Sequence, residues 1–165
     1  MRREHLGARG TEQQESGFTL IELMMVVFII AILIAVLMPV FFGATARAKD
    51  RAMQSSLHDA LTAAKTVYAD KADYTQATTG ALTTATGAIT FVGSSSLPNG
   101  QNTVSVDPVS ASYIVLAGHS KAGSCFYLAD DASGTGTLYA KMGGAGGCAA
   151  SGAPLPGDPA WQSTW

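Results

Sequence analysis

The chain of 165 residues carries 10 Lys and Arg and 12 Asp and Glu, which give a formal net charge of -2 at pH 7. This balance excludes the basic surface of a dedicated nucleic-acid-binding protein, and no specific nucleic acid is expected as a partner. Apolar residues concentrate near one end, so the sequence predicts a membrane segment followed by a soluble part.

A polar leader ends at the junction Ser16-Gly17-Phe18-Thr19-Leu20-Ile21-Glu22, and an uncharged apolar run follows from Leu23 to Val40. At about 1.5 Å per residue, a helix from Leu23 to Ala44 is long enough to cross a hydrocarbon core of about 30 Å. An ordinary secretory signal is disfavoured, because its apolar region spans only about 7 to 15 residues. Signal-peptidase cleavage at Ala44-Thr45-Ala46 remains the alternative.

The junction and the helix after it resemble the cleavage and methylation segment of type IV prepilins and pseudopilins, over residues 17–49. The resemblance rests on Gly17 before Phe18-Thr19-Leu20-Ile21-Glu22, on the apolar run, and on Pro39, where many family members carry a helix-distorting proline. It implies that a membrane-embedded prepilin peptidase cuts the Gly17–Phe18 bond and methylates the new amino terminus at Phe18. Residues 1–17 are then the leader peptide.

Glu22 is a carboxylate near the start of an apolar helix, where it costs several kcal/mol unless it is paired or protonated. Cleavage after Gly17 creates a partner, the free amine of Phe18. The resemblance implies that this amine pairs with Glu22 of a neighbouring subunit and sets the register of assembly. A second interpretation is a capping box, in which Thr19 caps the helix and Glu22 reaches back to it. Both can hold at different stages.

Pro39 lies inside the apolar run, where it removes a backbone hydrogen bond and costs about 3 kcal/mol in a regular helix. Gly43 lowers the helix propensity further. The sequence therefore predicts a helix distortion between Val36 and Gly43, linked to assembly. The alternative is an ordinary kink of a membrane helix.

After the apolar run, charged residues appear while the helical pattern continues as one apolar stripe, formed by Met53, Leu57, Leu61, Ala64 and Tyr68. We expect residues 18–46 to form the transmembrane and filament-core helix. Residues 47–74 are its amphipathic continuation, which packs on a head domain and ends between Asp70 and Tyr74.

Residues 75–165 are predicted to form a β-rich head. Alternating apolar patterns separated by turn signals indicate strands at residues 88–92, 103–106, 112–117, 124–129 and 137–142, arranged as an antiparallel meander. The Thr-, Ala- and Gly-rich segment 75–87 is expected to be a surface loop or to carry a short strand. The predicted fold class is α+β and pilin-like, with a long amino-terminal helix on a small antiparallel sheet.

The two cysteines, Cys125 and Cys148, both fall in the head, and a disulfide between them is the natural interpretation. Unpaired thiols are the alternative. The resemblance agrees with the disulfide, since many pilins tie their carboxy-terminal region to the sheet in this way. Because the disulfide places the head outside the cell, it also orients the chain, whereas the basic residues on the two sides of the apolar run balance.

No catalytic residue, metal site or cofactor is predicted. The sequence Gly118-His119-Ser120-Lys121-Ala122 lacks the closing glycine of a nucleophile elbow and indicates a hairpin loop. Calcium binding by Asp130, Asp131 and Asp158 is the weaker interpretation of acids that are typical of turns. The tail from Pro154 to Trp165 is expected to pack over the sheet or to contact other subunits.

The predicted function is that of a pilin, a structural subunit of a type IV pilus-like filament and not an enzyme. It is stored as a single-pass protein of the cytoplasmic membrane and then assembled into an extracellular filament. Its expected partners are further copies of the chain, a prepilin peptidase, and the pilus or type II secretion machinery. A minor pilin or a type II secretion pseudopilin is the alternative within the class. A single-span anchored binding module is the alternative from another class.

Overall fold

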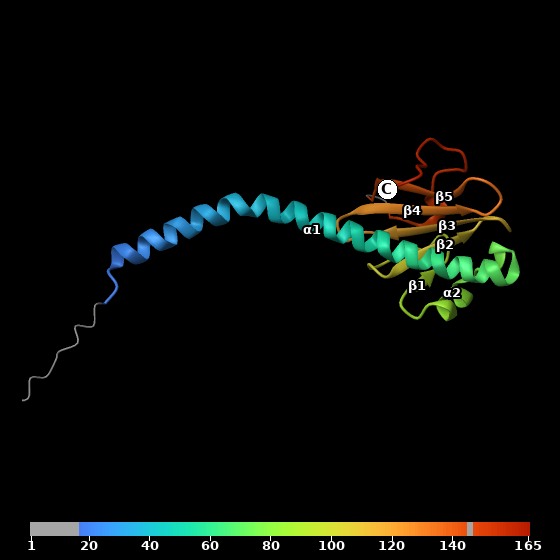
Figure 1. The fold of residues 1–165 in the computed structure, drawn as a ribbon, viewed down its shortest axis with the longest axis horizontal. Helices are drawn as coiled ribbons and strands as arrows, with labels where there is room; N and C mark the ends of the chain where they lie inside the picture. Colours follow the sequence, from blue (N-terminus) through green and yellow to red (C-terminus); the bar gives the residue numbers. More distant parts are fainter. Residues whose placement is uncertain (1–16, 145–146) are drawn as a thin grey trace, which may run out of the picture. The chain divides into compact units, whose positions relative to one another are not determined.

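The computed structural model describes residues 17–144 and 147–165. The chain divides into two compact units, Met1–Phe41 and Phe42–Trp165. Helix α1 runs from Leu20 to Lys71 and so passes through both (Figure 1). The second unit, which we call the head unit, contains the carboxy-terminal part of α1 and all other helices and strands of the described residues. The predicted leader lies outside the described residues except for Gly17.

The head unit is built on one five-stranded sheet in the order β1-β2-β3-β4-β5, so the α+β fold class is confirmed. The strands are β1 (Thr90–Val92), β2 (Thr103–Pro108), β3 (Tyr113–His119), β4 (Ser124–Asp131) and β5 (Gly136–Gly143). From β2 to β5 each strand pairs antiparallel with the next, as the meander prediction requires.

The expected pairing of the first strand was wrong, because β1 pairs with β2 in parallel, with Thr90 opposite Thr103. A tight hairpin turn would have reversed the chain after Val92. Instead, residues 93–102 form an irregular connection that returns the chain to the same end of the sheet, and Gly100 adopts a φ of 129° within it. The Asn99-Gly100 turn signal therefore lies in a crossover connection and not in a hairpin.

The prediction that segment 75–87 forms a surface loop or carries a short strand was wrong. The segment holds a short 3₁₀ helix at Tyr74–Gln76 and helix α2 (Thr79–Ala85). Thr78 caps α2, since its hydroxyl accepts a hydrogen bond from the Ala81 N–H at 3.3 Å. Leu82, the one large apolar residue of the segment, is fully buried in the core and fixes the helix there.

The carboxy-terminal part of α1 lies along one face of the sheet (Figure 1). The predicted apolar stripe is buried from Met53 to Ala64, and it packs against alternate residues of β3 and β4, namely Ile114, Leu116, Phe126 and Leu128. The helix ends at Lys71, and Ala72 follows with a φ of 52°, so the expected end between Asp70 and Tyr74 is confirmed.

Asp130 on β4 is the centre of a buried polar network on this face. Its carboxylate accepts hydrogen bonds from the Tyr74 hydroxyl at 2.6 Å and the Thr137 hydroxyl at 2.7 Å, and it pairs with the Lys65 ammonium at 3.0 Å. Burial alone would raise the pKa of Asp130, but these hydrogen bonds and the Lys65 charge hold the pKa below its usual value. The network joins α1 to β4, β5 and the turn after α1.

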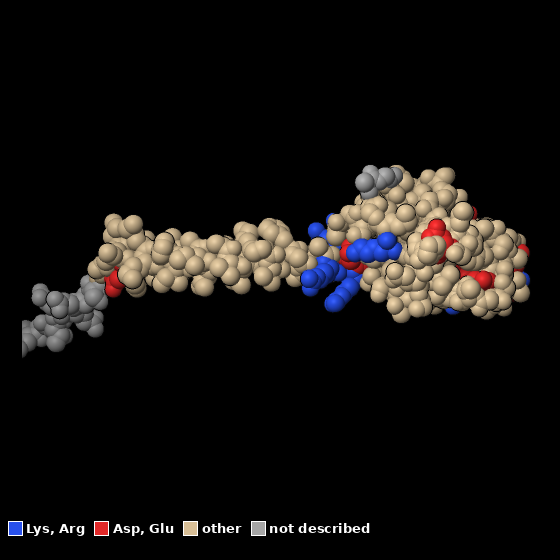
Figure 2. Space-filling view, turned by 90° about the horizontal axis from the view of Figure 1, so that it is seen from above, with Lys and Arg blue, Asp and Glu red and all other residues tan. Residues whose placement is uncertain are grey.

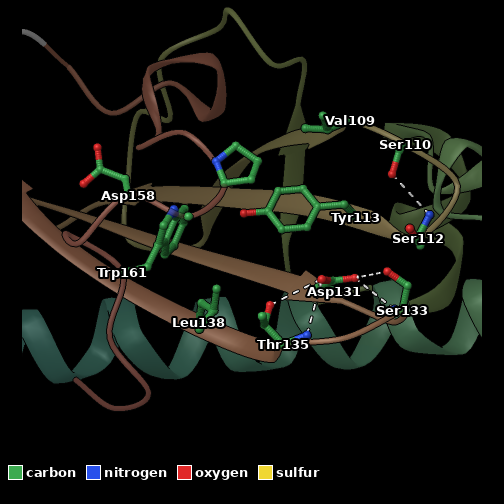
Figure 3. Close-up of a pocket in the computed structure, with 12 residues that line it drawn as sticks. Val109, Ser110, Ser112, Tyr113, Asp131, Ser133, Thr135, Leu138, Asp158 and Trp161 are labelled. Atoms are coloured by element: carbon green, nitrogen blue, oxygen red, sulfur yellow. Dashed lines mark hydrogen bonds between the residues drawn. The ribbon is translucent and has the colours of Figure 1, made fainter.

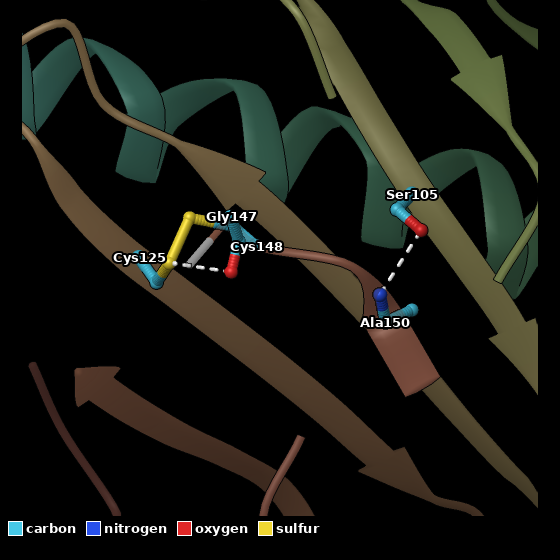
Figure 4. The surroundings of a disulfide bond; sticks show 5 residues. All are labelled: Ser105, Cys125, Gly147, Cys148 and Ala150. Atoms are coloured by element: carbon cyan, nitrogen blue, oxygen red, sulfur yellow. Dashed lines mark hydrogen bonds between the residues drawn. A yellow bond between two sulfur atoms is a disulfide. The ribbon is translucent and has the colours of Figure 1, made fainter. Parts of the chain in front are cut away.

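The opposite face of the sheet is covered by the chain after β5, from Cys148 to Trp161. The disulfide between Cys125 and Cys148 anchors this segment to β4 (Figure 4). Next to it, the Ala150 N–H donates to the buried Ser105 hydroxyl at 3.0 Å. Further on, Tyr139 and Gln162 exchange two backbone hydrogen bonds of 2.8 Å, so the tail also pairs with the free edge of β5.

The two tryptophans of the tail pack on opposite faces of the sheet, which agrees with the expectation that the tail packs over it. Trp161 packs with Leu138 on the face away from α1. The Trp165 ring lies 5.0 Å, centre to centre, from the rings of Phe126 and Tyr139 on the α1 side.

The Asp130 network predicts how the head responds to acid. Because the folded-state pKa of Asp130 is depressed, its ionised form stabilises the head above the unfolded-state pKa, near 4, and this contribution is lost as the pH falls through the folded-state pKa. We expect Asp130→Asn to lower the free energy of unfolding at pH 7 by about 1 to 2 kcal/mol, because it weakens two hydrogen bonds to a buried carboxylate and removes its ion pair with the half-exposed Lys65. The loss of stability between about pH 5 and pH 2 should be shallower in the variant.

Denaturant unfolding across this pH range measures both effects, and Asp59→Asn, at an exposed position on α1, is the matched control. The control should retain the acid dependence of the unchanged protein. An Asp130→Asn variant with an unchanged acid dependence would contradict the assigned role of the network.

Candidate functional site

The predicted cleavage junction is sterically open. Gly17 and Phe18 precede the first residue of α1, and Phe18 is 88% exposed. A Cβ placed on Gly17 would have no described atom within 4 Å. A protease can therefore approach the Gly17–Phe18 bond without first unfolding any described element.

Helix α1 begins with a complete capping box. The Thr19 N–H and hydroxyl donate to Glu22 Oε2 at 2.9 and 2.7 Å, and the Glu22 N–H donates to the Thr19 hydroxyl at 3.3 Å. The Leu23 N–H reaches the Thr19 carbonyl at 3.3 Å, which closes the first turn. These reciprocal bonds satisfy donors that a helix start otherwise leaves unpaired, and they fix the position of the carboxylate.

Within the described residues Glu22 has no salt bridge. The two salt bridges there join Lys65 to Asp130 and Lys141 to Asp50, both in the head unit. The capping box gives Glu22 polar contacts but no positive charge. An amine created at Phe18 would lie in the sequence directly before the Thr19 cap.

The apolar surface that follows is not covered by the other described residues. Large apolar side chains from Leu20 to Val40 are exposed, between 48% at Ile30 and 76% at Leu20. Helix α1 contains a window of 18 residues with mean hydropathy 3.2, so its length and composition allow it to cross a membrane. In Figure 2 this part of α1 carries no Lys or Arg. An exposed apolar surface of this extent requires a membrane or other apolar partners.

Pro39 and Gly43 both lie within the continuous helix, which extends without interruption from Leu20 to Lys71. The described chain thus tolerates the proline inside α1. The distortion expected between Val36 and Gly43 stays a prediction about the assembled state.

The serine that follows β3 serves the fold. Ser120 begins the turn between β3 and β4, as the hairpin prediction states, and its hydroxyl donates to Asp50 at 2.6 Å. Lys141 of β5 pairs with the same carboxylate at 2.9 Å. This contact of Asp50 with the β3–β4 turn and with β5 was not predicted, because its sequence position indicates only an exit from the apolar run.

The acids considered for calcium make hydrogen bonds within the head. Asp131 accepts from the backbone and hydroxyl groups of Ser133 and Thr135 and so shapes the turn between β4 and β5. These bonds lower the pKa of Asp131, with the Ser133 hydroxyl as the main cause. In residues 17–144 and 147–165, no three His, Cys, Asp or Glu side chains gather in a way that could hold a metal ion.

Comparison with known sequences finds a motif at this end of the chain. Residues 13–38 match the family described as the prokaryotic N-terminal methylation motif. The match includes the predicted cleavage junction and most of the apolar run. No curated protein and no solved structure matches the chain.

The exposed junction, the uncovered apolar helix and the motif match together define the class of protein: the chain carries a type IV pilin-like leader. More particularly, the motif supports a precursor of the type IV pilin-like or pseudopilin kind.

The open junction leads to a prediction on processing. If the peptidase requires glycine before the cut, Gly17→Ala should leave most of the chain with its leader attached, although the added Cβ meets no steric obstacle within the chain. Peptide mass spectrometry of the amino terminus in membranes of cells that express the chain measures the cut fraction. Gly10→Ala, a change of the same kind within the leader, should be cut normally. Efficient cutting of Gly17→Ala would refute the requirement for glycine.

Proposed function

We propose that the chain is a pilin, the structural subunit of a type IV pilus-like filament. The observation that carries this proposal is the exposed apolar part of α1 placed directly after a methylation-motif junction. A chain of this design has two ways to cover that surface, by the membrane before assembly and by neighbouring helices after it. Its function is then assembly, and the described residues act as structural parts.

The proposed sequence of events begins with the chain in the cytoplasmic membrane as a single-pass protein. Prepilin peptidase removes residues 1–17 and methylates Phe18. The pilus or secretion machinery then extracts α1, and the apolar residues of neighbouring copies pack against each other. Relative to water, burial of each large apolar side chain contributes about 1.5 to 3 kcal/mol, and lateral packing of the helices preserves this burial after the chain leaves the membrane.

Glu22 gives this packing its register. In a bundle of parallel apolar helices the carboxylate requires a positive partner, and the Phe18 amine of a neighbour shifted along the axis supplies it. The capping box supports this role, because it holds the carboxylate at the first turn of α1 with one oxygen occupied by Thr19. The other oxygen has no hydrogen bond within residues 17–144 and 147–165 that would compete with the amine.

We propose further that α1 stretches or bends between Val36 and Gly43 when it enters the filament. Pro39 has no backbone N–H, so the helix already lacks one hydrogen bond here. Distorting this part of the helix therefore breaks fewer hydrogen bonds than distorting another part. In domain terms, residues 18–46 form the filament core, residues 47–74 connect it to the head, and residues 75–165 face the surroundings of the cell.

A minor pilin or a type II secretion pseudopilin shares the same motif and helix, and abundance in sheared filaments distinguishes these from a major pilin. A single-span anchored binding module is the candidate from another class, and it would keep its leader.

The capping and pairing roles of Glu22 can be separated by two variants. Glu22→Gln keeps a side chain that completes a capping box but removes the charge, whereas Thr19→Ala removes the cap, at about 1 kcal/mol, and keeps the charge. If Glu22 pairs with the Phe18 amine, the yield of sheared filaments should fall at least about tenfold in Glu22→Gln and remain within about twofold in Thr19→Ala. Quantified subunit in the sheared fraction, relative to subunit in the membrane, gives the readout.

Processing at Gly17 is followed in the same samples, so that an assembly defect is not mistaken for a cleavage defect. Normal filament yield from processed Glu22→Gln, together with a loss in Thr19→Ala, would assign Glu22 to the cap alone.

A further inference from the structure

The head unit contains a groove of about 500 Å³ on the sheet face away from α1 (Figure 3). One wall is formed by the sheet, with Tyr113 of β3 and Leu138 of β5. The other wall is the carboxy-terminal segment, with Pro156, Asp158 and Trp161. The Cys125–Cys148 disulfide anchors the chain that leads into this second wall. The groove has the volume of an ordinary small-molecule site.

Tyr113 is the feature that marks the groove as a binding site. Its side chain is nine-tenths buried, and its hydroxyl is the one buried side-chain polar atom without a hydrogen-bond partner in the part of the chain that the structure describes. In Figure 3 the hydroxyl points toward the side of the groove where Asp158 and Trp161 lie. Unpaired buried hydroxyls are costly and rare, and a ligand in the groove would supply the missing partner.

The charge of the lining excludes anions. The groove is lined by Asp131 and Asp158 and by no Lys, Arg or His among the described residues. Asp131 is already engaged in the turn, where it accepts hydrogen bonds from Ser133 and Thr135. Asp158 accepts one hydrogen bond, from the Ala160 N–H at 2.8 Å, and retains acceptor capacity. The lining therefore offers hydrogen-bond acceptors more than a concentrated negative charge.

The remaining lining combines apolar surface with hydroxyl groups. The indole of Trp161 is held in place because its N–H donates to the carbonyls of Pro154 and Leu155 at 3.2 and 3.1 Å. Hydroxyl groups come from the other side of the groove, from Ser110, Ser112, Ser133 and Thr135. A rigid ring beside donors and acceptors suits a ligand with one apolar face and several hydroxyl groups.

We propose that this groove binds a neutral saccharide. The C–H face of a sugar ring packs against Trp161, its hydroxyl groups hydrogen-bond to the Tyr113 hydroxyl and the Asp158 carboxylate, and no charge has to be neutralised. The proposal does not depend on filament assembly, since every residue it uses lies in the head unit.

The test is a titration of the full chain followed by NMR of the indole N–H groups. The chain is held in uncharged polyoxyethylene micelles, which carry no sugar or ammonium group. The probes are glucose, galactose, N-acetylglucosamine and their β-1,4-linked disaccharides. We expect at least one probe to shift the Trp161 resonance saturably and to leave that of Trp165, on the opposite sheet face, in place. A Trp161→Phe sample assigns the two resonances.

Tyr113→Phe is the decisive variant, because it removes only the unpartnered hydroxyl and should not lower the melting temperature. It should weaken binding about three- to tenfold. Tyr127→Phe, which removes the same atom from the same sheet face outside the groove lining, should bind within about twofold of the unchanged chain. Asp158→Asn, which keeps an acceptor oxygen, should retain binding within about threefold.

Three outcomes would overturn the proposal. One is the absence of a saturable Trp161 shift with every saccharide up to about 50 mM. Another is equal weakening by Tyr113→Phe and Tyr127→Phe. The third is binding of tetramethylammonium alone, abolished by Asp158→Asn, which would identify an acidic site for organic cations.

Discussion

The amino-terminal part of α1 presents an apolar surface that no other described residue covers, and the design of the helix start follows from this constraint. From Leu20 to Val40 the large side chains are about half exposed or more. In water this surface would cost tens of kcal/mol, which exceeds the net stability of an ordinary domain. A membrane, or a bundle of like helices, must therefore be part of the folded state. The same constraint explains why a single carboxylate at the start of the helix is held by a capping box and why we propose a positive partner for it after cleavage.

In the head unit the carboxy-terminal part of α1 is covered by the sheet. Beyond the charged residues near Asp50, α1 has one apolar stripe, and the sheet buries it. Polar contacts then fix the helix on the sheet at two points, Asp130 with Lys65 and Tyr74, and Asp50 with Lys141 and Ser120. On the other face no α-helix of the described residues packs on the sheet. The tail after the disulfide, with a short 3₁₀ helix at Ala150–Gly152, covers this face and pairs with the edge of β5 at Gln162. The groove beside Trp161 exists because this tail crosses the sheet as an irregular chain.

The sequence predicted the features that depend on local patterns. Spacing and turn residues predicted three of these features: the helical stripe from Met53 to Tyr68, the approximate bounds of the strands, and the hairpin at Ser120. The junction at Gly17 could be predicted because a glycine, a capping-box pattern and an apolar run of membrane length seldom occur together. The features that the sequence missed depend on long-range contacts. Leu82 forms a helix because the core accepts its side chain, and β1 is parallel because the chain crosses over before β2. Tyr113 and Trp161 line the same groove only because of the path that the tail takes across the sheet. No hydrophobic periodicity in the sequence predicts that path.

The central claim is that α1 is processed after Gly17 and then becomes the core of a polymer. Intact mass and amino-terminal peptide mass spectrometry on filaments sheared from cells that express this chain test it most directly. The account predicts a polymer fraction whose subunit begins at a methylated Phe18. A chain that begins at Met1, or at Arg47 after signal-peptidase cleavage, with no polymer, would contradict it.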